Sequence, residues 1–412
     1  MIVKTSLKVI AVILITIASY AGAVQYWAWK WETPSKALPA GHLTFNESFS
    51  EEASGNLWAE SAQVKMTELA TQLQSVSMSG AMTVDGNLAW VGSVGLARVE
   101  PLEEATATTQ YRIGSVSKAL TAVAMMRMVE EGLLDLDVPI QTYLPDYPQH
   151  DADITLRQLA SHMSGIRHYG FDIRRFPPTD SVSNEHYVDA IAALEQFKGD
   201  DLLFTPGQGF NYSTHGYTLL SAVMQAAGGK RFEALVADLV TQPLGTTSTQ
   251  AESELQSTKL LAGFYSSDGG LYGETPEQNL SNKVAGGGFV STPMDLVKLG
   301  RALLSEQLLK PESFTEMTTV QPMYDGSENQ QGYALGWRHY ETRHILDEDN
   351  QVDVIHHGGR SFGADTFLLL VPEYNIAVAI TTNGQSEESR GEIQMLAYEL
   401  AGMVIRERMA GD

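Results

Sequence analysis

The sequence predicts an α+β fold in which an antiparallel sheet flanked by helices is built from both ends of the chain. β-prone segments occur near the start and again near the end, whereas helical patterns dominate the residues between them. Two β-prone runs, Met78–Val84 and Leu88–Val94, surround Asp85-Gly86-Asn87 and are typical of a hairpin. The later strand-like runs are Tyr333–His339, Val352–His357, Thr366–Val371 and Ile376–Thr382. We therefore expect a mainly helical lobe inserted into the sheet lobe, with a cleft between the two.

The N-terminal residues 1–29 are typical of a signal peptide or membrane anchor. Lys4 and Lys8 precede an apolar run from Val9 to Val24, and Ala21-Gly22-Ala23 has the small-x-small pattern of a signal peptidase site. Tyr26 and two tryptophans follow, which suits anchoring at a membrane interface if the segment is retained. The sequence predicts an extracytoplasmic, periplasmic protein that is released after cleavage or held at the membrane. Residues 30–56 are rich in Pro, Ser, Glu and Gly and are expected to form a linker.

Residues 57–410 are expected to form one domain. The sheet lobe is expected over about 57–114 and 330–410, and the helical lobe over about 133–310. A helix from Ser115 to about Glu131 links the two. The other expected helices are Leu57–Leu73, Thr155–His162, Tyr187–Phe197, Tyr217–Ala227, Phe232–Val240, Pro293–Leu304 and Glu388–Arg408.

Composition excludes several classes of function. The 412 residues carry a formal net charge of −23, which argues against a nucleic-acid partner because phosphate backbones require clustered Lys and Arg. No cysteine is present, so thiolate catalysis, disulfides and cysteine-based metal sites are ruled out. The ten histidines form no His-Glu-x-x-His pattern, and we expect neither a metal nor an organic cofactor.

The segment Ser115-Val116-Ser117-Lys118 is the candidate nucleophilic site. In a helix, residues i and i+3 share a face, so Lys118 would lie beside Ser115. A serine hydroxyl needs a neighbouring base, and a lysine serves as one when burial lowers its pKa. The apolar residues that follow Lys118 predict such burial.

Two further segments have a chemical character. The loop Phe210-Asn211-Tyr212-Ser213-Thr214 follows a Pro-Gly turn and could carry the Tyr212 phenol into the cleft as a proton shuttle. The segment His356-His357-Gly358-Gly359 lies on a predicted strand, where glycines allow close approach of a ligand.

Together these segments resemble the serine β-lactamase and penicillin-binding-protein superfamily, in particular its class C-related branch. In that superfamily Ser-x-x-Lys opens a helix, Tyr-x-Asn lies on a loop of the helical lobe, and Lys/His-x-Gly lies on a sheet strand. The resemblance covers about residues 60–405. It extends through Tyr111–Ser115, Ser161–Tyr169, Ala285–Thr292 and Gly336-Trp337.

The resemblance implies a role for each of these residues. Ser115 would be acylated, Lys118 would be its base and Tyr212 would share the proton transfers. The backbone N–H groups of Ser115 and Gly359 would form the oxyanion hole. Thr214, His356, His357 and Gly358 would contact a peptide or ester substrate, and the fold would be β-lactamase-like.

The chain departs from the family pattern at two places. Thr214 stands where the family has Asn, which exchanges an amide for a single hydroxyl. His356 and His357 stand where Lys-Thr is common, which replaces a permanent charge with a titratable one. We therefore expect weak or no β-lactamase activity.

Two alternatives remain open at this point. One is a catalytically idle binding or filament-forming protein on the same fold, and the sequence also allows an oligomer. The other is an α/β-hydrolase, because Gly359-Arg360-Ser361-Phe362-Gly363 matches Gly-x-Ser-x-Gly. The second requires Ser361 on a strand-to-helix turn, whereas the residues that follow it indicate a strand.

Overall fold

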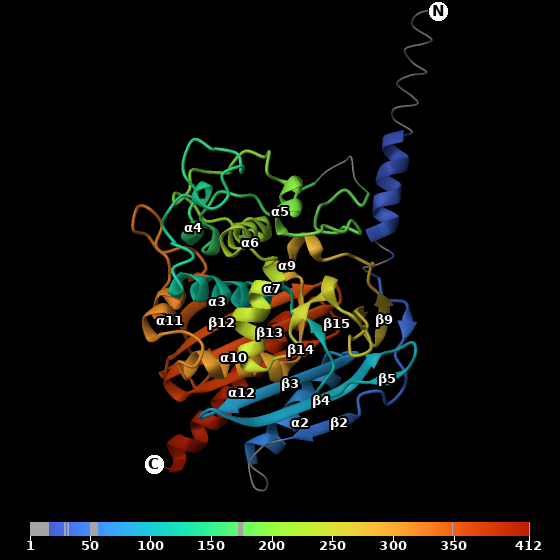
Figure 1. The fold of residues 1–412 in the computed structure, drawn as a ribbon. Helices are drawn as coiled ribbons and strands as arrows, with labels where there is room; N and C mark the ends of the chain where they lie inside the picture. The colour runs from blue at the N-terminus through green and yellow to red at the C-terminus, as the bar shows by residue number, and fades with distance from the viewer. Residues whose placement is uncertain are drawn as a thin grey trace, which may run out of the picture.

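The sheet of this protein is assembled from both ends of the chain, as the sequence predicts (Figure 1). A computed structural model describes residues 16–28, 30, 33–49, 57–171, 176–347 and 349–411. Its main sheet has eight antiparallel strands in the order β11-β12-β13-β14-β3-β4-β2, and β5 pairs with β4. The strands are β2 (Phe45–Phe49), β3 (Ser77–Val84), β4 (Asn87–Arg98), β5 (Glu103–Glu104), β11 (Arg338–Thr342), β12 (Val352–Ser361), β13 (Ala364–Val371) and β14 (Ile376–Thr382). The pairing of β14 with β3 joins the two ends of the chain, for example through Ile380 opposite Gly80.

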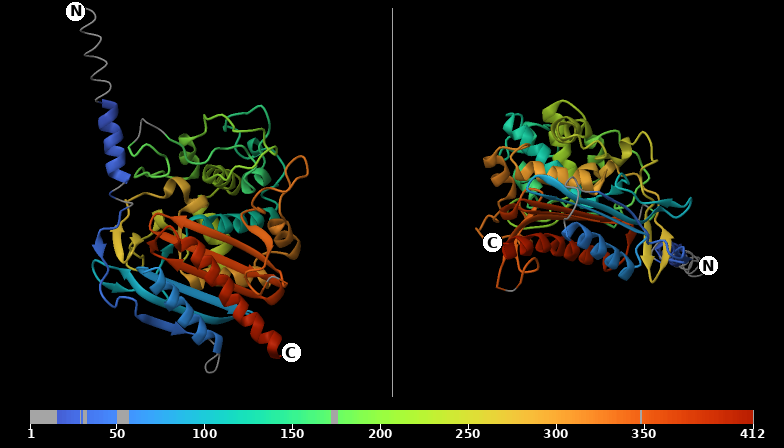
Figure 2. Two further views of the ribbon diagram at one scale, coloured as in Figure 1. Left: turned by 180° about the vertical axis from the view of Figure 1, so that it is seen from behind. Right: turned by 90° about the horizontal axis from the view of Figure 1, so that it is seen from below.

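Two hydrophobic cores cover the two faces of this sheet. Alternate residues of β14 divide between them: Ala377 and Ala379 belong to one core, whereas Ile376, Val378 and Ile380 belong to the other. The helices α2 (Leu57–Gln72) and α12 (Ser389–Gly411) pack on the second core and lie on the face away from the helical lobe (Figure 2). Because both faces are covered, β13 and β14 contain continuous apolar runs, Phe367–Val371 and Ile376–Ile380.

The helical lobe lies on the opposite face, above the long central helix α3 (Ser117–Glu130). Most side chains of α3 are buried, because the helix is enclosed between the sheet and the rest of the lobe. The other helices on this side are α4 (Leu156–Ala160), α5 (Ala190–Ala193), α6 (Thr214–Gly228), α7 (Phe232–Val236), α8 (Gln242–Leu244), α9 (Val284–Gly287), α10 (Pro293–Leu304) and α11 (Pro311–Thr318).

Several expected elements differ from those observed. The strand expected at Tyr333–His339 begins at Arg338, because Gly336 turns with a φ of +79° and packs against α3. A Cβ at Gly336 would lie 2.5 Å from Ala122 Cβ. The helix expected at Tyr187–Phe197 is shortened to α5 and a 3-10 turn, since Asp189 caps α5 by accepting from the Ala192 N–H.

A smaller four-stranded sheet was not predicted. It contains β1 (Lys36–Ala37), β8 (Tyr265–Asp268), β9 (Leu271–Glu274) and β15 (Gly384–Gln385). The expected linker at 30–56 thus contributes β1 to this sheet and β2 to the main sheet.

The N-terminal apolar run lies partly outside the described residues. Within the described ranges, no helix has the length and apolar character needed to cross a membrane. Residues 16–28 are helical, and Tyr20 contacts Phe176 edge to face at 6.2 Å.

Candidate active site

Ser115 lies on a 3-10 turn, Gly114–Val116, that leads directly into α3. The turn is held by Ser117, whose Oγ donates a hydrogen bond of 2.7 Å to the Gly114 carbonyl. Lys118 is in the first turn of α3, and its Nζ lies 3.3 Å from Ser115 Oγ. The structure therefore brings together the two side chains of the Ser-x-x-Lys segment.

Lys118 is fully buried among neutral acceptors. Its Nζ donates to Thr214 Oγ1 at 3.2 Å and to the Gly286 carbonyl at 2.7 Å. Burial lowers the pKa of this amine, and the positive charge of Arg338 lowers it further, although Tyr212 opposes the shift. Loss of hydration favours the neutral amine, which is the form that accepts a proton.

Tyr212 is the second titratable group beside Ser115. Its ring centroid lies 4.8 Å from Lys118 Nζ. Burial raises the pKa of the phenol, but the charges of Lys118 and Arg338 and the interaction with Ser115 outweigh burial, and the net pKa is lowered. A depressed tyrosine pKa beside an amine with a depressed pKa suits proton transfer.

Two histidines that the sequence did not single out fix the loop that carries Tyr212. His162 Nδ1 accepts the Ser213 N–H at 3.1 Å, and His168 Nδ1 accepts the Thr214 N–H at 3.1 Å. Burial lowers the pKa of His168 to about 3 and that of His162 well below its ordinary value, so both accept as neutral rings. In the sequence, these two histidines were indicated only by their place in Ser161–Tyr169, a segment that resembles the superfamily.

The two histidines of β12 lie on opposite faces of the sheet, because side chains alternate along a strand. The His357 ring is buried towards α3, where Nε2 lies 2.9 Å from the Tyr333 hydroxyl and Nδ1 lies 2.7 Å from the Gly358 carbonyl. Burial and the charges of Arg338 and Lys118 hold the pKa of His357 well below its ordinary value. His356 packs instead between Tyr340 and Phe367, and it does not line the pocket at Ser115.

The backbone register of β12 decides which N–H groups face the pocket. His339 donates its N–H to the Gly332 carbonyl, away from β12, so its neighbour Arg338 directs its backbone groups towards β12 and pairs with His356. Backbone groups alternate along a strand. The N–H groups of Gly358 and Arg360 therefore face the same edge of β12 as that of His356, but they lie beyond Arg338, the first residue of β11.

Gly359, the expected oxyanion donor, has its backbone groups directed towards β13. Its Cα instead lies against the turn at Ser115, since a Cβ there would be 2.0 Å from the Ile113 carbonyl and 3.0 Å from Ser115 N. Arg360 has its backbone against Gly114, where an added Cβ would be 2.7 Å away. The register thus favours Arg360, one residue further along, as the donor that faces the pocket.

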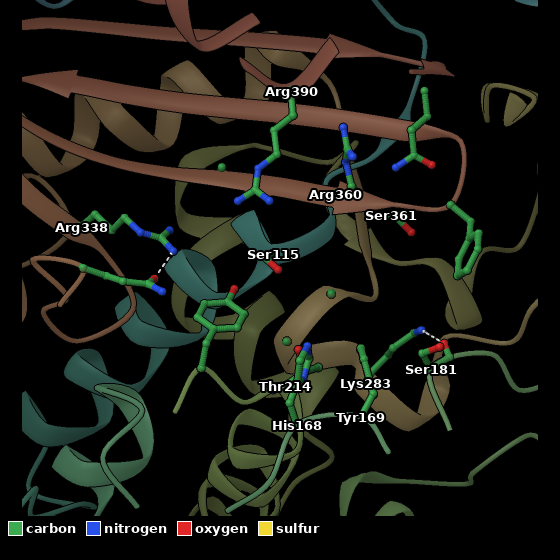
Figure 3. A pocket seen from close by; sticks show the side chains of 17 residues that line it. Ser115, His168, Tyr169, Ser181, Thr214, Lys283, Arg338, Arg360, Ser361 and Arg390 are labelled. Atoms are coloured by element: carbon green, nitrogen blue, oxygen red, sulfur yellow. Dashed lines mark hydrogen bonds between the residues drawn. The ribbon is translucent and has the colours of Figure 1, made fainter. Parts of the chain in front are cut away.

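A pocket of about 620 Å³ lies at Ser115 (Figure 3). Ser115, Tyr212, Thr214, Gly358 and Arg360 line it, together with His168, Tyr169, Ser181, Lys283, Gly286, Gly287, Gln331, Arg338, Ser361, Phe362, Gln385 and Arg390. No carboxylate is among these lining residues, although the chain as a whole is strongly acidic. Burial lowers the pKa of Lys283 to about 7.

Ser361 lines the same pocket but lacks the setting of a nucleophile elbow. It ends β12, and β13 begins at Ala364, so a strand follows where an α/β-hydrolase requires a helix. Across the described ranges, no group of three His, Asp or Glu side chains could hold a metal ion.

The sequence of this chain is similar to a family model and to individual relatives. Residues 63–402 match the family model described as Beta-lactamase. Serine beta-lactamase-like protein LACTB, mitochondrial, of Mus musculus is 29% identical over 399 residues, which covers 76% of this chain and 72% of the relative.

Solved structures share the fold at lower identity. The octameric penicillin-binding protein homologue from Pyrococcus abyssi has a TM-score of 0.68 at 23% identity, covering 84% of this chain and 77% of that one. The D-amino acid amidase from Ochrobactrum anthropi SV3 has a TM-score of 0.71 at 20% identity, covering 85% of this chain and 99% of that one.

Proposed function

The chain belongs to the beta-lactamase family, and on that premise we propose that it is an extracytoplasmic serine hydrolase that acts on a peptide or ester through an acyl-enzyme on Ser115. The observation that carries this proposal is the buried amine of Lys118, 3.3 Å from Ser115 Oγ. Its other hydrogen-bond acceptors are neutral oxygens. A lysine that only supported the fold would instead be expected to pair with a carboxylate.

The first half of the reaction is acyl transfer to Ser115. Neutral Lys118 accepts the Ser115 proton as Oγ attacks the substrate carbonyl. The N–H groups of Ser115 and Arg360 bind the developing oxyanion. The carbonyl re-forms as the leaving group departs. The leaving group takes its proton from the Lys118–Tyr212 pair.

The second half of the reaction is hydrolysis of the acyl-enzyme. The same pair accepts a proton from water, which attacks the ester carbonyl. The proton returns to Ser115 Oγ as the acid product leaves, which restores the starting state.

β-Lactam turnover is expected to be weak. Thr214 offers Lys118 a single hydroxyl where the family has an amide. His356 and His357 stand where Lys-Thr is common, and burial holds both rings neutral. A β-lactam carboxylate therefore meets no charge at this motif position.

The N-terminal segment places the domain outside the cytoplasm in this proposal. Its support is the pair Lys4 and Lys8 before the apolar run to Val24, which suits export followed by cleavage or membrane tethering. The oligomeric state stays a prediction from sequence.

Intact-mass analysis after incubation with a panel of peptides, esters and penicillin tests the proposed function. We expect a covalent adduct with the acyl group of an ester or peptide, and little or none with penicillin. Penicillin turnover that matches dedicated β-lactamases would overturn the assigned substrate class. Absence of any adduct on the folded protein would favour the idle binding or filament-forming alternative.

A further inference from the structure

His168 lines the pocket at Ser115 with one ring nitrogen that the fold does not use. Its Nδ1 atom accepts the Thr214 N–H at 3.1 Å. A neutral imidazole carries its proton on the nitrogen that is not the acceptor, so Nε2 is the protonated atom. Burial lowers the pKa of His168 to about 3, which keeps the ring neutral near pH 7. The backbone contact therefore fixes His168 as an Nε2–H donor.

The Nε2–H group of His168 is open to the pocket. It has no hydrogen-bond partner within the described ranges, and it is not one of the buried polar atoms. His162 gives the contrast, because its Nδ1 accepts the Ser213 N–H at 3.1 Å while its own Nε2 is buried. Both rings support the loop that carries Tyr212, but only His168 can also donate to a bound molecule.

His168 lies where the acyl part of a substrate would extend. In the proposed reaction the leaving group is protonated beside Tyr212, and the Arg338 guanidinium lies 5.8 Å from the centroid of that ring. The leaving group therefore departs on the Arg338 side. Figure 3 shows His168 across Ser115 from Arg390 and away from Arg338. The acyl group, which stays on Ser115, is thus the part that extends towards His168.

A carbonyl oxygen is the partner that suits this donor. The His168 ring is neutral, so it offers an anion no charge–charge attraction, and no carboxylate is among the residues that line the pocket. An alkyl chain over Nε2 would displace water and leave the N–H group unpaired, which costs free energy. A carbonyl oxygen in the same place would accept the hydrogen bond.

We propose that His168 is a substrate-binding residue whose Nε2–H donates to a carbonyl oxygen within the acyl part of the substrate. The enzyme then favours peptide-like acylamino groups over plain alkanoyl groups. This role rests on the proposed function for the position of the acyl group. It narrows the substrate from any peptide or ester to one that carries such a carbonyl.

Three methyl esters of equal chain length test the preference. N-acetylglycine methyl ester has the carbonyl and an N–H group, methyl levulinate keeps the carbonyl alone, and methyl pentanoate has neither. NMR titration of full-length Ser115→Ala measures the binding of each ester without a working nucleophile. We expect the two esters with the carbonyl to bind about two- to tenfold more tightly than methyl pentanoate, the range of one hydrogen bond.

His168→Asn separates the donor from the structural role of the ring. The Asn side-chain oxygen can still accept the Thr214 N–H, but no atom occupies the place of Nε2. In the Ser115→Ala background we expect this variant to weaken binding of the two carbonyl esters about two- to tenfold and to change methyl pentanoate less than about twofold. His162→Asn makes the same exchange at the ring whose Nε2 is buried, and it should affect all three esters alike.

Equal effects of His168→Asn on the three esters would give the ring a structural role alone and overturn the proposal. Methyl pentanoate that binds Ser115→Ala as tightly as methyl levulinate, or no binding of any ester by the folded protein, would overturn it as well. Thermal unfolding of each variant checks the fold. Failure of every ester to acylate the parent protein would overturn the proposed function instead, because the binding preference is measured without the Ser115 hydroxyl.

Discussion

The Nζ atom of Lys118 lies 3.3 Å from the Oγ atom of Ser115 and within hydrogen-bond distance of two further oxygens. Because those acceptors are neutral and the site is buried, the lysine is less stable as a cation here than in water. This relationship connects the fold to the proposed chemistry.

Lys118→Met should abolish most of the reactivity of Ser115 while keeping the side-chain volume. Removing a general base typically costs about 10²- to 10⁴-fold in rate. The rate of Ser115 acylation by an activated ester, followed by mass, measures the loss. Lys298→Met on α10 is the control, since Lys298 lies in an ion pair with Asp295 outside the pocket. A Lys118→Met rate within about threefold of the parent rate would mean that another group is the base.

Tyr212→Phe should shift the pH profile in a defined direction. Lys118 must be neutral to accept a proton, so the rate rises with pH through the pKa of this amine, which lies below its ordinary 10.5. Tyr212 raises the pKa of Lys118, so its removal should move the acidic limb of kcat/KM to lower pH and also reduce the plateau. A limb that moves to higher pH would show that the phenol does not interact with the lysine in this way.

Two adjacent glycines of β12 provide a matched pair of substitutions. Gly359→Ala would place a Cβ 2.0 Å from the Ile113 carbonyl and should displace the strand from the Ser115 turn. Gly358→Ala meets its nearest neighbour, Phe367, at 3.5 Å, which is an ordinary contact. We expect the first variant to lose thermal stability and acylation and the second to keep its stability. Equal unfolding temperatures for the two variants would contradict the close approach of Gly359 to the turn.

Buried histidines should make the protein sensitive to acid. Burial lowers the pKa of His356 and of His168 from 6.5 to about 3, so the folded state binds fewer protons than the unfolded chain between these values. Their contribution to stability is complete above about pH 6.5 and is lost as pH falls towards 3. Each histidine adds at most about 1.4 kcal/mol per pH unit to this loss.

His356→Phe should therefore flatten the dependence of unfolding free energy on pH by up to one proton. Urea unfolding between pH 7.5 and 5 measures the slope. His344→Phe, at an exposed position, is the control. An unchanged slope in His356→Phe would show that the ring is not held neutral in the folded protein.

The sequence predicted the fold class and the superfamily, and both are confirmed. Its strongest signals were the alternating and apolar runs at the chain ends and the pairing of Ser115 with Lys118, which depends only on helix geometry. In the strand motif, the residue types alone do not determine which side chains and N–H groups face the pocket. A shift of one residue along a strand exchanges both the face of each side chain and the edge of each N–H. This is why His356 lies away from the pocket and why the register favours Arg360 over Gly359.

Other features of the site had no local pattern to reveal them. Arg338 and Arg390 are far apart in sequence, yet the fold places both in the lining of the pocket at Ser115. His162 and His168 act on the backbone of a loop about fifty residues downstream. Such long-range contacts depend on chain topology, which spacing along the sequence does not encode.

Fluorophosphonate labelling of the folded protein tests the central claim most directly. We expect stoichiometric labelling that maps to Ser115, that is abolished in Ser115→Ala and that persists in Ser361→Ala, since both serines line the pocket. Labelling that survives in Ser115→Ala but is lost in Ser361→Ala would contradict the account and assign the nucleophile to the end of β12.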